Sequence, residues 1–136
     1  MRERAKTFLE EAESLLARGK YDIACFNAEQ ATQLYLKALT LRLLGYIPRT
    51  HRAKEILGMI SKALKEMGRE DLERRIEDLV ENAKRDLREL EDAYVGSRYL
   101  LRMYDREDAV RCIEVAKRIF EICRGIEDEI SGRFNR

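Results

Sequence analysis

The stretch from Tyr21 to Leu57 constrains the fold of this 136-residue chain more than any other. Small residues recur along one side of its first part, so a neighbouring helix can approach closely. Leucine side chains widen the apolar surface, which is typical of a central helix buried on several sides. Asp22 is a suitable N-cap, and Gly45 with Pro48 ends the helix. Thr50 then offers an oxygen to the first amides of the next helix. The small residues are Ala24, Ala28, Ala31 and Ala38.

Apolar residues at helical spacing predict four more helices along the chain. The first helix ends at Gly19, and the third ends at Gly68. The fourth is expected to be the longest and runs from Leu72 to Tyr94. Asp105 and Asp108 form a carboxylate variant of the capping box, which starts the fifth helix.

Short connections between these helices predict an all-α fold, an antiparallel (up-and-down) four-helix bundle with an additional fifth helix. We expect a single domain over residues 1–130 and a frayed tail over residues 131–136, where the periodic pattern stops. The fifth helix carries two apolar stripes, and one bundle contact covers only one of them. The second stripe, with Val115, Ile119 and Ile122, predicts the interface of a homodimer.

The composition excludes several classes of function. Charged residues make up 39% of the chain but leave a net charge of +1, so attraction of nucleic acid depends on a local patch. Cys25, Cys112 and Cys123 form no CxxC pair, which predicts buried free thiols rather than a zinc or redox centre. The only histidine lacks the Glu-x-x-His spacing of a di-metal centre. We expect no metal, no cofactor and no membrane span, in a cytoplasmic protein.

A local basic patch lies within the central stretch. No Asp or Glu occurs between Gln30 and Lys54. Gln30 and Lys37 lie two turns apart on one face of an apolar helix, where an amide and an ammonium each require a partner. We interpret Glu29, next to Gln30, as a solvated or helix-paired charge rather than a general base. The positive residues of the stretch are Lys37, Arg42, Arg49, Arg52 and Lys54.

His51 lies in this basic patch at the expected start of the third helix. It has two interpretations. Together with free backbone amides, and reinforced by Arg49 and Arg52, it binds an anion. Alternatively, it only hydrogen-bonds to residues nearby in the chain.

Two blocks of residues resemble the signatures of the HEPN family, small α-helical nucleotide-associated domains. The blocks stand in the family's order and at suitable spacing, and with the preceding helix they cover most of the chain. The resemblance implies the same all-α fold. The first block has Tyr21, Ala24, Phe26, Gln30-Ala31, Lys37-Ala38, Gly45, Pro48 and Thr50-His51, and the second has Tyr94, Ser97-Arg98-Tyr99, Tyr104 and Arg106-Glu107-Asp108-Ala109.

Many HEPN toxins are metal-independent ribonucleases that use an arginine and, four to six residues later, a histidine, paired across a homodimer. Arg98 matches the arginine. The positions for the histidine hold Met103, Tyr104 and Asp105. The chain therefore resembles a branch of the family that lacks the nuclease motif and is often encoded beside a minimal nucleotidyltransferase.

The resemblance implies a non-catalytic domain that forms a homodimer in a two-component system of the toxin–antitoxin kind. Its ligand would be a nucleotide or RNA, and its partner a separate minimal nucleotidyltransferase chain. The chain departs from the branch's usual Arg-Tyr-Pro-Asp, because Leu100 and Leu101 follow Tyr99. Two alternatives stay open: a ribonuclease that uses Arg98 with a different proton carrier, and a helical protein-interaction module. The residues expected to bind a nucleotide or phosphate are Gln30, Lys37, Arg49, His51, Arg52, Arg98 and Tyr99.

Overall fold

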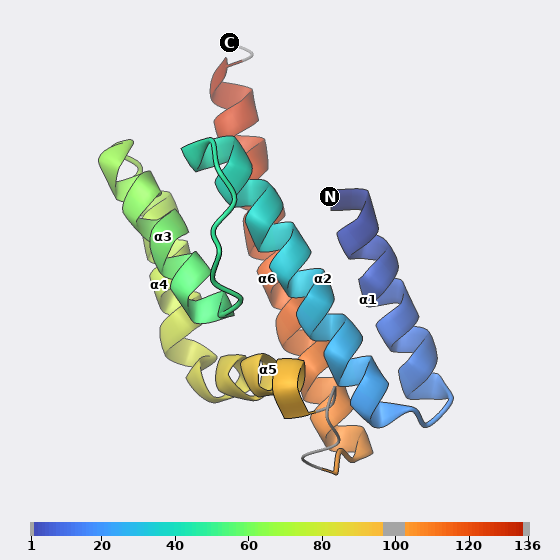
Figure 1. Cartoon of the computed structure of the whole chain (residues 1–136). Helices are drawn as coiled ribbons and strands as arrows, with labels where there is room; N and C mark the ends of the chain where they lie inside the picture. The colour runs from blue at the N-terminus through green and yellow to red at the C-terminus, as the bar shows by residue number, and fades with distance from the viewer. Residues whose placement is uncertain (1, 97–102, 135–136) are drawn as a thin grey trace.

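The computed structural model describes residues 2–96 and 103–134, with side chains at 2–94 and 103–132. Within these ranges the chain forms six α-helices and no strand (Figure 1). The predicted all-α fold class is therefore confirmed. The helices are α1 (Arg2–Ala17), α2 (Tyr21–Leu44), α3 (Ala53–Glu66), α4 (Glu70–Asn82), α5 (Lys84–Gly96) and α6 (Arg106–Phe134).

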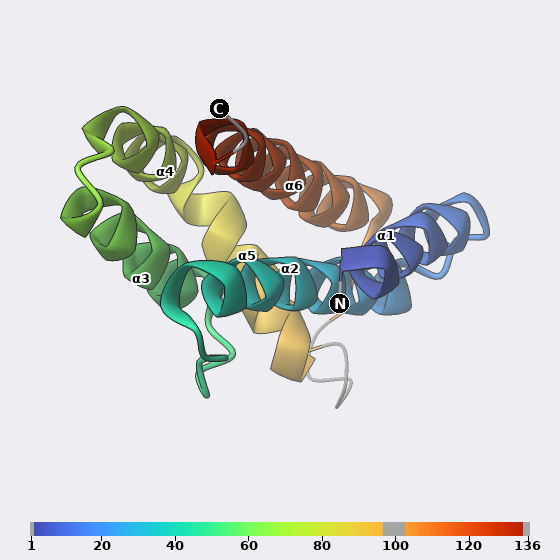
Figure 2. The ribbon, with the colours of Figure 1, turned by 90° about the horizontal axis from the view of Figure 1, so that it is seen from above.

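Helix α2 is the centre of the fold. It packs against α1, α3, α5 and α6, and Figure 2 shows it between α1 and α3 with α6 covering one side. Its small residues Ala24, Ala28 and Ala31 are fully buried, as their spacing predicts. Gly45 ends the helix in the left-handed conformation (φ 81°) and donates its N–H to the Leu41 carbonyl at 3.0 Å.

The start of α2 differs from the prediction. The helix begins at Tyr21, and the residue before it, Lys20, makes no side-chain capping hydrogen bond. Asp22 therefore lies in the first turn instead of at the N-cap, where its negative charge still favours the positive end of the helix dipole.

The fourth helix expected from the sequence is two helices, and this corrects the prediction of one long helix from Leu72 to Tyr94. The backbone leaves the helical conformation at Ala83 (φ −115°, ψ 26°). Leu79, Ala83 and Leu87 are all buried, so the apolar spacing continues across the bend and does not reveal it. As a result α4 packs on α3, whereas α5 crosses the end of the bundle and contacts α2 and α6 (Figure 1).

Helix α6 is the longest of the described helices, with 29 residues. Its capping box is confirmed: the Asp105 N–H donates to Asp108 Oδ2 at 3.0 Å, and the Asp108 N–H donates to Asp105 Oδ1 at 2.8 Å. The helix continues through Ser131 to Phe134, so most of the segment expected to be a frayed tail is helical.

Both apolar stripes of α6 are covered by the chain itself. Val115 is 1% exposed and Ile119 is 0% exposed, while Ile122 is half-buried against the core. This corrects the expectation that Val115 and Ile119 face a partner, because α6 packs these residues against other helices of the same chain, among them α1, α2, α4 and α5. Homodimer formation itself stays a prediction and would require another surface.

The three cysteines are buried and form no disulfide in the described part of the chain, as predicted. Among the described residues, no three His, Cys, Asp or Glu side chains are grouped closely enough to hold a metal ion. No helix in the described ranges is long and apolar enough to span a membrane.

Candidate functional site

Glu29 is a buried carboxylate on the central helix and is only 3% exposed. Its Oε1 accepts a hydrogen bond from Gln30 Nε2 at 2.8 Å, and its Oε2 accepts one from Gln33 Nε2. Of the two interpretations of Glu29 from the sequence, the solvated charge is therefore wrong and pairing within the helix is correct. Glu29 is paired within its own helix, with two amides and no cation as hydrogen-bond donors.

Burial raises the pKa of the Glu29 carboxyl to about 7. The hydrogen bonds from Gln33 and Gln30 lower the pKa, but less than burial raises it. The charge of Lys37 also lowers it, whereas the charge of Glu91 on α5 raises it further. Glu29 therefore changes its charge near neutral pH.

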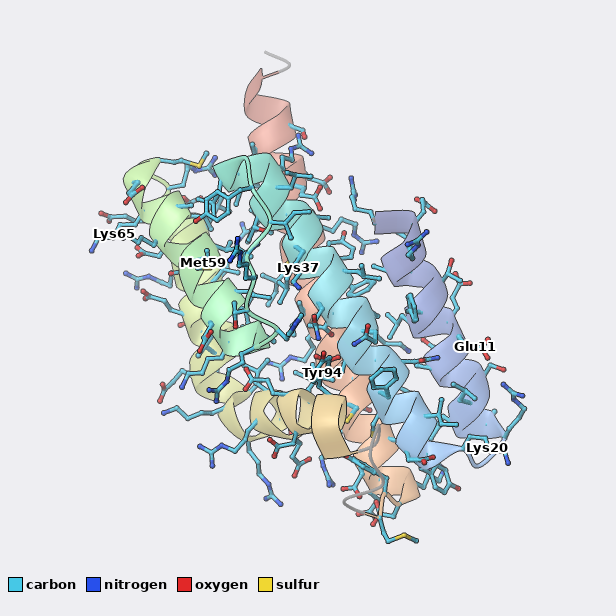
Figure 3. The ribbon with its side chains drawn as sticks, viewed as in Figure 1. Glu11, Lys20, Lys37, Met59, Lys65 and Tyr94 are labelled. Carbon is cyan, nitrogen blue, oxygen red and sulfur yellow. The ribbon has the colours of Figure 1, made fainter. Side chains whose placement is uncertain are left out.

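His51 lies at the end of the loop that runs back along α2 before α3 begins (Figure 1). Its Nδ1 is 3.0 Å from Gln33 Oε1 and 3.4 Å from Lys37 Nζ. Its ring stacks on Tyr94 of α5, with the ring centroids 5.2 Å apart and the planes inclined by 16°. Figure 3 shows Lys37 midway along α2 and Tyr94 near the point where α5 approaches it. The loop before α3, helix α2 and helix α5 thus meet at the His51 imidazole.

The start of α3 has its backbone donors paired with side chains of the chain itself. Thr50 Oγ1 accepts the Arg52 N–H at 3.2 Å, which confirms its expected capping role. The Lys54 N–H donates to Glu91 Oε1 at 2.8 Å. The Arg52 guanidinium lies 3.8 Å from the Glu91 carboxylate. A carboxylate from α5 thus occupies the helix terminus at which the sequence predicts a bound anion.

A cavity of about 260 Å³ lies between the start of α3 and α5, and we call it the α3–α5 groove. Lys54 and Arg88 form no ion pair with any side chain in the described part of the chain. Lys84 pairs only with Glu81 of the adjoining helix, at 3.8 Å. The groove therefore holds cations that its own acids do not fully neutralise. It is lined by Arg52, Lys54, Lys84, Leu87, Arg88, Glu91 and Asp92.

The HEPN domain model matches residues 1–126 of the chain. This chain belongs to the HEPN domain family. Among solved structures it is similar to TT1696 from Thermus thermophilus, with 27% sequence identity and a TM-score of 0.71. That similarity covers 91% of this chain and 93% of TT1696. No curated protein matches the sequence.

The structure of this HEPN domain brings together only part of the predicted site. Lys37 and His51 meet at 3.4 Å, and Gln30 joins them through Glu29 and Gln33. Arg52 lies at the α3–α5 groove. Arg49 is exposed on the loop before His51, and no contact of its side chain fixes it to the site. Arg98 and Tyr99 lie outside the described residues.

Arg42 belongs to a different place in this HEPN domain. Its guanidinium lies 3.4 Å from Glu127 Oε2 on α6, where Arg2 also reaches the same oxygen at 3.2 Å. It also donates a hydrogen bond to Ser131 Oγ. The basic patch predicted from the sequence is therefore divided between two separate places in the fold.

Several residues of the site were not predicted from the sequence. Glu29 and Gln33 stand at i, i+4 spacing on an apolar helix, and that spacing was a usable signal for a buried polar pair. Lys84, Arg88 and Glu91 carried no such signal, because the bend at Ala83 that turns α5 toward α3 does not interrupt the apolar spacing.

Proposed function

We propose that this HEPN domain binds the phosphates of a nucleotide in the α3–α5 groove, next to His51, and does not itself cleave RNA. The observation that supports this proposal is the pair of cations, Lys54 and Arg88, without ion-pair partners in a cavity of about 260 Å³. Ammonium and guanidinium groups form charge-assisted hydrogen bonds with phosphate oxygens. A net charge of only +1 on the whole chain makes this local excess the relevant attraction.

The polar cluster beside the groove adds groups that suit a nucleotide. Lys37 and His51 supply a cation and an imidazole, and Arg52, which follows His51 in the sequence, lines the groove. Arg98 and Tyr99 belong to the second family block, which begins at Tyr94 in the last turn of α5. We include both in the proposal as further phosphate contacts, together with Gln30 and Arg49.

The proposed lack of catalysis follows from the missing proton carrier. A positioned base contributes about 10²–10⁴-fold to attack by a 2′-hydroxyl. Arg98 cannot act as this base, because a guanidinium stays protonated. Asp105, at one of the positions expected for a histidine, accepts the Asp108 N–H at 2.8 Å and so caps α6.

We propose a separate minimal nucleotidyltransferase as the partner of this domain, in a two-component system of the toxin–antitoxin kind. This proposal is supported by the family membership and by the absence of the Arg-x4-6-His motif from the sequence. A nucleotidyltransferase reading frame beside the gene, and a stable complex of the two purified chains, would support it. Separate elution of the two chains at micromolar concentration would contradict it.

The groove is tested with ATP as the probe. Lys54→Ala with Arg88→Ala should weaken ATP binding at least ~10-fold, because each lost charge-assisted hydrogen bond is worth about 1.5–3 kcal/mol. Titration calorimetry at several salt concentrations should also show a smaller salt dependence. The matched control is Lys62→Ala with Lys65→Ala, which removes the same charge at the exposed far end of α3 (Figure 3).

Equal ATP affinity and equal salt dependence in the groove variant and the native protein would show that the groove is only a solvated surface. Arg49→Ala with Arg52→Ala provides an independent test of the loop side of the site. We expect weaker binding from this variant as well.

A second candidate function, RNA cleavage, is favoured by one observation. The only imidazole of the chain, His51, stacks on Tyr94 of α5, and Arg98 follows the end of α5 at Gly96 by two residues in the sequence. His51 thus contacts the helix that precedes the family's arginine, although it is distant from Arg98 in the chain.

Incubation with structured and single-stranded RNA in EDTA distinguishes the two functions. We expect little or no cleavage by the purified native protein. Cleavage that disappears in both Arg98→Ala and His51→Ala would establish the ribonuclease and identify His51 as the proton carrier. Cleavage that persists in both variants would indicate a contaminating nuclease.

A further inference from the structure

Gln33 connects the buried carboxylate of Glu29 to the exposed ring of His51. Its Nε2 donates to Glu29 Oε2, so its Oε1 is the atom that faces His51 Nδ1 at 3.0 Å. A carboxylate only accepts hydrogen bonds, which fixes the orientation of the Gln33 amide. An amide oxygen also only accepts, and therefore the Nδ1 of His51 has to carry the proton of this contact.

Lys37 is the competing neighbour of the same nitrogen. Its ammonium, 3.4 Å from Nδ1, is a donor and would favour an unprotonated Nδ1. Gln33 is only 6% exposed and is held by Glu29, whereas the Lys37 side chain is long and partly exposed. The closer and better-anchored group is Gln33. The proton therefore belongs on Nδ1, and Nε2 of the neutral ring is the acceptor.

We propose that Glu29 is a positioning residue, which acts through Gln33 to hold His51 as the Nδ1–H tautomer and present Nε2 to the ligand. The significance of this tautomer for binding rests on the proposed function. Nε2 makes no hydrogen bond with any described residue, and His51 is exposed. Protonation of the ring then occurs at Nε2, which places the new donor on the side available to a phosphate oxygen.

The orientation of the Gln33 amide depends on a group at position 29 that only accepts hydrogen bonds, as a carboxylate does. A glutamine at position 29 could donate as well as accept, so the Gln33 amide could turn over and offer its NH₂ to His51. The charged neighbours of Glu29 are Lys37 on its own helix and Glu91 on α5, and neither makes a hydrogen bond to it. Gln33 is therefore the connection that a substitution at position 29 changes.

The single histidine allows a direct test by NMR. Long-range ¹H–¹⁵N correlation spectra of the ligand-free full chain at pH 8 report which ring nitrogen carries the proton. We expect mainly Nδ1–H in the native protein. Glu29→Gln should shift the ring to Nε2–H or to a mixture. Glu91→Gln is the matched control, because it neutralises the other carboxylate near the cluster, and it should leave Nδ1–H unchanged.

A double variant tests whether the Nδ1–H tautomer of His51 can be restored. In Glu29→Gln with Gln33→Glu, position 33 becomes the acceptor-only group, so Nδ1–H should return as the main form. Gln33→Leu removes the acceptor without changing charge and should also release the tautomer, which keeps the test available if Glu29→Gln does not fold.

A native ring protonated mainly on Nε2 would overturn the proposal, and so would an Nδ1–H fraction that is the same in the native protein and the folded Glu29→Gln variant. The spectra are recorded without ligand, so the tautomer result does not depend on ATP binding. Failure of ATP to bind would count against the proposed function only.

Discussion

At the scale of single residues, the two buried glutamates of this HEPN domain have different partners. Glu127 on α6 lies within 3.4 Å of the guanidinium groups of Arg2 and Arg42. Glu29 on α2 receives hydrogen bonds only from the amides of Gln30 and Gln33. A buried carboxylate without a cation as its hydrogen-bond donor costs free energy when it is charged. This cost appears as the raised pKa of Glu29, about 7.

This raised pKa predicts a pH-dependent stability. Below pH 4.5, the ordinary pKa of the group, Glu29 is protonated in both the folded and the unfolded chain. Between pH 4.5 and about 7 the folded state keeps a proton that the unfolded state loses. The stabilisation from Glu29 is therefore present at low pH and is lost as the pH rises through about 7.

We expect Glu29→Gln, which does not titrate, to gain up to ~3 kcal/mol in unfolding free energy relative to the native protein between pH 4.5 and pH 8. Urea unfolding at pH 5 and pH 8 measures this difference. Glu10→Gln, at an exposed position of α1, is the control and should show no such change. Parallel stability curves for the native protein and Glu29→Gln would mean that Glu29 titrates at its ordinary pKa.

At the scale of helices, the bend at Ala83 determines which side chains meet. It turns α5 across the end of the bundle, so that Tyr94 reaches His51 and Glu91 reaches the Lys54 amide. The start of α6 is fixed to α5 by Arg111, whose guanidinium lies 3.0 Å from Glu89 Oε2. The site thus depends on the direction of one short helix more than on the length of any helix.

At the scale of the whole molecule, the core is continuous and includes residues from every helix. Helix α6 buries its apolar side chains against α1, α2, α4 and α5, so these residues stabilise the monomer fold. A homodimer, which stays a prediction, would have to use side chains that remain exposed. Such apolar side chains include Leu41, Tyr46 and Ile47 near the end of α2.

Ile119→Glu tests the role of α6 in the core. Ile119 is 0% exposed, and an unpaired buried charge costs several kcal/mol, out of the ~5–15 kcal/mol that stabilises a typical domain. We therefore expect loss of cooperative thermal unfolding, measured by circular dichroism. Arg118→Glu places the same side chain at the exposed neighbouring position and should stay folded. A folded Ile119→Glu protein with half the native mass by light scattering would instead locate a dimer interface on α6.

Much of the helical structure of this protein could be predicted from the sequence alone, because it depends on residues close together in the chain. The spacing of apolar residues predicted helices, because one buried face repeats every three to four residues. Gly45 and the pair Asp105 and Asp108 set helix ends through interactions with residues close in the chain, so these ends were predicted correctly. The two residue blocks led to the HEPN family, which the match over residues 1–126 confirmed.

Tertiary structure alone decided how the site is assembled. The bend at Ala83 keeps the apolar spacing of a straight helix, so the sequence did not reveal that α5 approaches α2 and α3. The burial of Glu29 depends on which helices cover α2, and the contact of His51 with Tyr94 joins residues 43 positions apart in sequence. The coverage of both α6 stripes likewise depends on the packing of several helices at once. Such contacts arise from the relative placement of helices, which periodicity along one helix does not contain.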